Sequence, residues 1–127
     1  MNKILENLRY AKTHEWIELP DTTVHIGITD FAQQALGDLV FINLPEVGDP
    51  VTMGEAFGDL ESVKAVSDVI SPATGVVTAV NQAVIDEPGL INENPFDNWL
   101  IKVGVITEEV ELMTASEYEA FCSKEAH

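Results

Sequence analysis

The chain has 127 residues, the size of one compact domain, and 46% of them are apolar, enough to form a buried core. Six basic residues against 22 acidic ones give a net charge of −16, which argues against nucleic-acid and anionic-membrane binding and favours basic partner surfaces. No apolar stretch is long enough to span a bilayer, and the first residues resemble neither a signal peptide nor a transit peptide. We therefore expect a single domain over residues 1–127.

The N-terminal third carries strand patterns. Residues 2–9 read as an extended lead-in, and residues 16–19 read as a strand followed by a turn. Residues 23–29 alternate, with Val24, Ile26 and Ile28 on one face, which is the period of a half-buried strand.

A short helix is expected directly after this strand. Thr29 or Asp30 can cap its start, and Gly37 can close it in the left-handed conformation. We expect Phe31, Ala35 and Leu36 to face inward.

The rest of the chain again predicts short strands. They cover residues 38–44, 56–63, 66–71, 76–80 and 99–105, with turns at 45–50 and 71–75 and a long surface loop at 82–98. Thr114 and Glu117 form a capping-box pattern that predicts a terminal helix. Cys122 lies in that helix, and we expect it to be a partly buried apolar residue. These elements predict a mainly β sandwich or barrel with short peripheral helices.

Lys64 lies between two predicted strands that are almost continuous. If both belong to one sheet, Lys64 is at the tip of a tight hairpin and its four-carbon stem projects away from the fold. A solvated surface lysine is the ordinary alternative. However, Val-Lys-Ala-Val has none of the Asn-Gly or Asp-Gly chemistry typical of such turns, which favours a functional reason for the lysine.

The segment ESVKAVSD, residues 61–68, followed by SPATGVV, resembles the modification site of lipoyl-carrier domains. The spelling Glu-Ser-Val-Lys-Ala is similar to the glycine cleavage H-protein family, and four further segments agree in order. They are YAKTHEW at 10–16, VHIGITDFAQQALGDLVFINLP at 24–45, DEPGLIN at 86–92 and NPFDNWLIKV at 94–103. The resemblance covers nearly the whole chain.

The resemblance implies a barrel–sandwich hybrid fold with lipoate attached covalently to Lys64. It implies a carrier without turnover of its own, which shuttles the aminomethyl group of glycine from a pyridoxal-phosphate glycine decarboxylase to a tetrahydrofolate-dependent aminomethyltransferase. Dihydrolipoamide dehydrogenase and lipoate attachment enzymes are the other implied partners, and the carrier is expected as a monomer. The expected location is the bacterial cytoplasm, or the mitochondrial matrix for a trimmed eukaryotic form.

The resemblance also implies roles for four further residues. Glu15 and Asp68, with Thr13 nearby, would contact the arm or its aminomethyl cargo, and Glu61 would be recognised by attachment enzymes. Each could instead be a solvated surface residue. Some family members carry a histidine in the short helix where this chain has Ala35.

Three alternatives remain at the level of the sequence. A lipoyl or biotinyl module of another complex is disfavoured by the Val-Lys-Ala spelling and by the matching terminal thirds. An H-like scaffold that relays lipoyl groups to other complexes would have the same motif. A small hydrolase would need a nucleophile and base in one pocket, and none is visible. His14 lacks such a partner pattern, so we expect a structural hydrogen bond, and the three histidines have no metal-ligand spacing.

Overall fold

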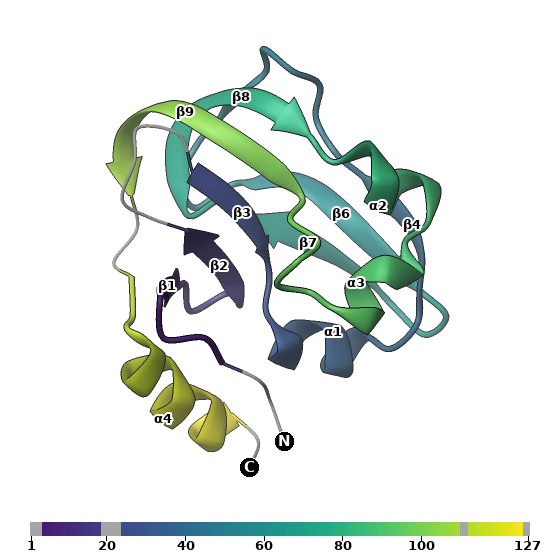
Figure 1. The fold of residues 1–127 in the computed structure, drawn as a ribbon, viewed down its shortest axis with the longest axis vertical. Helices are drawn as coiled ribbons and strands as arrows, with labels where there is room; N and C mark the ends of the chain where they lie inside the picture. Colours follow the sequence, from purple (N-terminus) through teal and green to yellow (C-terminus); the bar gives the residue numbers. More distant parts are fainter. Residues whose placement is uncertain (1–3, 19–23, 110–111, 126–127) are drawn as a thin grey trace.

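The computed structural model describes residues 4–18, 24–109 and 112–125, and the strands in these residues form two sheets (Figure 1). The first sheet has the order β1-β2-β3-β9-β8-β5, and the second has the order β4-β6-β7. The strands are β1 (Leu8–Tyr10), β2 (Glu15–Glu18), β3 (Val24–Ile28), β4 (Leu39–Asn43), β5 (Pro50–Val51), β6 (Ala56–Ser62), β7 (Val66–Ile70), β8 (Ala73–Val80) and β9 (Ile101–Glu109). The helices are α1 (Asp30–Leu36), α2 (Gln82–Asp86), α3 (Gly89–Glu93) and α4 (Ala115–Glu125). The prediction of a mainly β fold with short helices and a terminal helix is confirmed.

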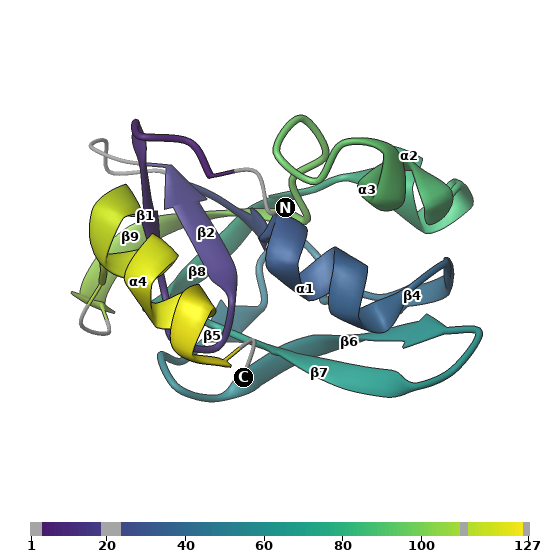
Figure 2. The same ribbon diagram turned by 90° about the horizontal axis from the view of Figure 1, so that it is seen from below.

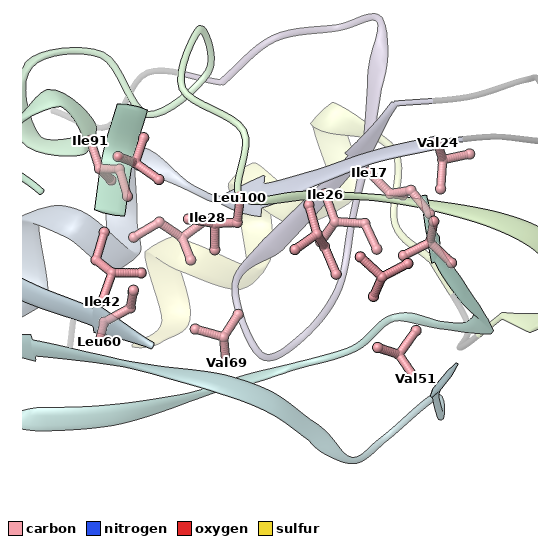
Figure 3. Packing of buried hydrophobic residues seen from close by; sticks show 14 of the residues in the cluster. Ile17, Val24, Ile26, Ile28, Ile42, Val51, Leu60, Val69, Ile91 and Leu100 are labelled. Atoms are coloured by element: carbon pink, nitrogen blue, oxygen red, sulfur yellow. The ribbon is translucent and has the colours of Figure 1, made fainter. Parts of the chain in front are cut away.

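The core lies between the two sheets. Ile17, Ile26 and Ile28 from the larger sheet face Leu60 and Val69 from the smaller one (Figure 3). The alternation predicted for β3 is therefore confirmed. Gly27, on its other side, packs under Trp16, where an added Cβ would lie 2.6 Å from the indole ring. The close contact explains why a glycine interrupts this strand.

Two sequence predictions about loops were wrong. The predicted turn at 71–75 ends early, because β8 already begins at Ala73 and pairs with β9. The predicted loop at 82–98 contains α2 and α3, each only five residues long. Such short helices are stabilised by burial rather than by propensity, here of Val84 and Ile91, and periodicity does not reveal them.

Helix α1 has the predicted ends. The hydroxyl of Thr29 accepts a hydrogen bond from the N–H of Ala32 at 3.2 Å, and Gly37 follows the helix with a φ of 81°. Phe31 and Leu36 are half-buried as expected, but Ala35 is exposed. The inward placement of Ala35 was wrong because α1 lies at the side of the core, with an open groove along one face.

Helix α4 begins with the predicted capping box. The N–H of Thr114 donates to Glu117 Oε1 at 2.9 Å, and the N–H of Glu117 donates to Thr114 Oγ1 at 3.3 Å. The helix packs beside β1 (Figure 2), where Tyr118 joins a second, aromatic cluster. Cys122 is buried in this cluster, as expected.

Candidate functional site

Lys64 lies at the tip of the β6–β7 hairpin, and this prediction is confirmed. The N–H of Ser62 donates to the carbonyl of Ala65 at 2.8 Å, so Val63 and Lys64 form the turn. The hydroxyl of Ser62 accepts from the N–H groups of Lys64 and Ala65 at 3.2 and 3.1 Å. This side-chain turn replaces the missing Asn-Gly chemistry. Sequence reasoning overlooked Ser62, although a serine two residues before the tip is the signal for such a turn.

A second contact fixes the hairpin to the end of α1. The N–H of Val63 donates to the carbonyl of Asp38 at 3.1 Å. Asp38 follows Gly37, whose carbonyl accepts from Asn92 Nδ2 at 2.9 Å. Asn92 Oδ1 also accepts from the N–H of Leu39 at 2.9 Å, so α3 holds the segment on which the hairpin rests.

The stem of Lys64 differs from the expected outward projection. The residue is exposed, but its stem passes over Gly37, where an added Cβ would lie 3.4 Å from Lys64 Cε. A Cβ at position 37 would be in van der Waals contact with the stem, and a side chain there would be strained at positive φ. The stem lies along the end of α1 rather than in open solvent.

Two pockets lie in this part of the molecule. The first, about 190 Å³, runs along α1 and is lined by Leu36, Ala35, Ala32, Phe31, Thr13, His14 and Ser67. The second, about 310 Å³, is lined by Ala11, Lys12, Thr13, Gly54, Ile70, Ser71 and Pro72. Thr13 lines both, so the loop before β2 separates them. Figure 2 shows α1 above the β6–β7 hairpin, the two elements between which the first pocket opens.

Glu15 is the buried acid of this region, with only 3% of its surface exposed. Its Oε1 accepts a hydrogen bond from the hydroxyl of Thr13, and its Oε2 accepts from the N–H of Ile70 at 3.3 Å. Burial raises the pKa of Glu15 to about 7, although these hydrogen bonds oppose the rise. The carboxyl group therefore titrates near neutral pH, at a point shared by the N-terminal loop and β7.

Asp68 and Glu61 are exposed residues on two neighbouring strands of the smaller sheet. Asp68 in β7 pairs with Asp59, and Glu61 in β6 pairs with Val66. Asp68 is two residues before Ile70, whose N–H binds Glu15. The structure thus joins Thr13 directly to Glu15 and places Asp68 on the strand that Glu15 contacts.

His14 makes a structural hydrogen bond, as the sequence analysis expected. Its Nδ1 lies 2.7 Å from the hydroxyl of Tyr118, and its ring stacks on Phe31 with centroids 4.4 Å apart. Sequence reasoning did not identify Tyr118, because 104 residues separate the pair and no local pattern connects them. Within residues 4–18, 24–109 and 112–125, no group of three or more His, Cys, Asp or Glu side chains is placed to hold a metal ion. None of the helices in the described part of the chain is long and apolar enough to cross a membrane.

Comparison with known proteins decides the family. The family model for the glycine cleavage H-protein matches residues 8–125. The chain belongs to this family. A glycine cleavage system H protein of Lachnoclostridium phytofermentans is 53% identical over 124 residues, which cover 97% of this chain and 98% of the relative. One from Alkaliphilus oremlandii is 48% identical over 98% of this chain and 99% of its own.

The fold agrees with a solved member of the family. The crystal structure of a glycine cleavage system H protein from Mycobacterium marinum superimposes with a TM-score of 0.89 at 42% identity. The match covers 98% of this chain and 100% of that chain. The barrel–sandwich hybrid fold implied by the sequence resemblance is therefore confirmed.

Proposed function

We propose that the protein is a lipoyl-lysine carrier of a glycine cleavage system. Lys64 would carry the lipoyl group, and the carrier would take the aminomethyl group of glycine from glycine decarboxylase to the tetrahydrofolate-dependent aminomethyltransferase. The observation that carries the proposal is an exposed lysine on a fixed hairpin, with its stem beside Gly37 at the end of α1, close in sequence to a pocket along α1 whose lining residue Thr13 binds the buried acid Glu15. Family membership supports the same role.

The hairpin fits an attachment lysine. Lys64 is exposed, so an attachment enzyme can reach its Nζ, while the hydrogen bonds of Ser62 and Val63 hold its backbone in one shape. Acylation of Nζ forms an amide and removes the positive charge, so the stem can lie along Gly37 and Leu36 without burying an ammonium group. When bound, lipoate supplies the dithiolane that accepts the cargo and two electrons, and the protein supplies position and shelter.

Glu15 fits the cationic end of the cargo. A carboxyl group whose pKa is about 7 has a high free energy when it is ionised and alone. A protonated amine beside it would form a charge-assisted hydrogen bond and keep the carboxylate ionised. Thr13 would orient Oε1 through its hydroxyl. We propose that this pairing holds the aminomethyl group away from water between the two enzymes.

Asp68 and Ala35 would tune the same site. Asp68 is exposed, so its carboxylate would contribute a weak, solvent-screened attraction for the amine. Ala35 lines the first pocket with one methyl group, where some family members carry a histidine. We infer that the part of the arm that passes position 35 is held there by apolar contact alone.

Glu61 would serve recognition rather than cargo binding. It is exposed on β6 between Phe41 of β4 and Val66 of β7. Phe41, Val63 and Val66 are each more than half exposed. We propose that lipoate attachment enzymes read this acidic and apolar surface beside Lys64. The net charge of −16 fits basic surfaces on these enzymes and on the other partners, among them dihydrolipoamide dehydrogenase.

The test is a glycine–bicarbonate exchange assay with glycine decarboxylase and the enzymatically lipoylated protein. Wild type should support exchange of labelled carbon, and Lys64→Arg should support none although its circular-dichroism spectrum and thermal midpoint are unchanged. Lys124→Arg, an exposed lysine of α4, is the matched control and should behave as wild type. Exchange by Lys64→Arg would overturn the proposal. A lipoylated wild type that fails in exchange but donates its lipoyl group to another acceptor would instead be a relay scaffold.

A further inference from the structure

The hydroxyl of Tyr118 joins the two walls of the first pocket. It lies 2.7 Å from Nδ1 of His14, in the loop that carries Thr13 and leads into Glu15 of β2, and it donates to Thr29 Oγ1 at 2.6 Å. Thr29 caps α1, whose residues line the opposite wall. We propose that Tyr118 is a positioning residue, through which α4 fixes the loop of Glu15 against α1 and so sets how long the loaded arm is protected. This inference rests on the proposed function.

The loop needs such a constraint because its central residue is strained. His14 has a φ of 71°, a value that non-glycine residues rarely adopt. Its N–H donates to Ala11 and its carbonyl accepts from Thr29, both at 3.0 Å. Rotation of His14 to an ordinary conformation would break this turn and move its neighbours Thr13 and Glu15. Contacts of the His14 ring therefore fix the position of the Glu15 carboxylate, the group proposed to bind the cargo.

The hydroxyl of Tyr118 has a partner on each side. It donates to Thr29 Oγ1 at 2.6 Å and lies 2.7 Å from His14 Nδ1, where the tautomer of the His14 ring sets which of the two groups donates. Tyr118 is fully buried, so water cannot replace the phenol when the hydroxyl is removed. Loss of this one oxygen would leave both His14 and Thr29 without the bond that joins them.

Tyr10 offers a matched comparison. Its ring stacks on that of Tyr118 with centroids 4.5 Å apart and planes 6° apart, and it is equally buried. Its hydroxyl, however, is bound to the backbone of Leu5, with the N–H at 2.8 Å and the carbonyl at 2.7 Å. Removing either hydroxyl is the same chemical change in the same cluster, but only that of Tyr118 touches the pocket walls.

The experiment uses lipoylated protein loaded with glycine and glycine decarboxylase, and it measures the lifetime of the aminomethyl group. Tyr118→Phe should shorten this lifetime roughly five- to tenfold, the equivalent of about one hydrogen bond, with lipoylation unchanged. The lifetime in Tyr10→Phe should stay within about twofold of the wild-type lifetime, even if the thermal midpoint falls as much as it does in Tyr118→Phe. His14→Asn, which tolerates positive φ but lacks the ring, should resemble Tyr118→Phe and provides a second test if that variant does not fold.

Nuclear magnetic resonance of the unmodified protein gives an independent measure. The ring-nitrogen signals of His14 should be the same in wild type and in Tyr10→Phe, and they should shift in Tyr118→Phe together with the amide signals of Thr13 and Glu15. Equal lifetimes in wild type and Tyr118→Phe, or equal losses in both tyrosine variants, would overturn the inference. A wild type whose cargo decays as fast as aminomethylated free lipoamide would instead contradict the proposed function.

Discussion

The Lys64 hairpin and the loop that leads into Glu15 are built in different ways. The hairpin is exposed and is held by backbone hydrogen bonds and one serine hydroxyl, with valine side chains in solvent around the tip. Glu15 is buried, and the loop before it is held by side chains from two distant parts of the chain, Tyr118 of α4 and Phe31 of α1, which both contact His14. The difference matches two needs of a carrier. The attachment residue must be reached by enzymes, whereas the cargo must be kept from water.

The two regions also differ in how much their charged groups affect the stability of the fold. Lys64 lies where solvent screens its charge, so modification costs the fold little. Burial raises the pKa of Glu15 to about 7. The fold is therefore least stable when this carboxyl group is ionised and no cation is bound beside it. A cationic cargo would remove that cost. The hairpin is therefore suited to stay the same through a reaction cycle, and the loop is suited to respond to what is bound.

The largest expected effect tests the buried charge. The pKa of Glu15 is about 7 in the folded protein against 4.5 for an unperturbed glutamate, so the folded state binds one more proton than the unfolded state between these values. The contribution of Glu15 to stability is therefore most favourable at low pH and is lost as pH rises through about 7. The free energy of unfolding of wild type, minus that of Glu15→Gln, should fall by about 2.5 kcal/mol between about pH 5 and pH 8.

The measurement is urea unfolding of both proteins at several pH values. Glu117→Gln is the control, because hydrogen bonds from Thr114 lower the pKa of this exposed acid and its difference curve must slope in the opposite sense. A flat difference curve for Glu15→Gln would show that Glu15 is hydrated and not the buried acid described above.

A smaller effect tests the hairpin. Ser62→Ala removes the hydroxyl that accepts from Lys64 and Ala65, and it should lower the free energy of unfolding by about 1 kcal/mol. Enzymatic lipoylation should slow because the tip loses its fixed shape, while the lifetime of loaded cargo should not change. Ser67→Ala, in β7 beyond the turn, is the control for lipoylation. Normal lipoylation of Ser62→Ala would show that the attachment enzyme does not require the rigid turn.

The smallest effect concerns Asp68. Asp68→Asn should leave lipoylation intact and shorten the lifetime of the aminomethylated form by up to about fivefold, since an exposed ion pair contributes at most about 1 kcal/mol. Asp59→Asn, the cross-strand neighbour of Asp68, removes the same charge from the same sheet and should change the lifetime less. An unchanged lifetime in Asp68→Asn would remove Asp68 from the cargo site, and equal effects of the two variants would indicate a general field rather than a contact.

The features predicted correctly from the sequence are those that neighbouring residues determine. The alternation in β3, the caps of α1 and the capping box of α4 each depend on residues at most four apart. The Lys64 hairpin follows because two strand patterns leave no room for a longer connection. Helices α2 and α3 could not be predicted in this way, because their stability comes from the burial of Val84 and Ile91 in the shared core.

The same distinction between local and long-range contacts applies to the residues of the candidate site. Lys64 was found from its local motif and position, but the path of its stem over Gly37 depends on contacts that Asn92 makes across more than fifty residues. For Glu15, the sequence offered only a family resemblance. Its burial and raised pKa arise where the N-terminal loop meets β7, a contact of residues 55 positions apart. Long-range contacts of this kind leave no periodic pattern in the sequence.

Our proposal that Lys64 carries a lipoyl group can be tested by intact-mass analysis and peptide mapping of the protein isolated from its own cells. We expect one lipoyl group, on the peptide that contains Lys64. An unmodified Lys64 in cells that make lipoate, or a lipoyl group on a different lysine, would contradict it.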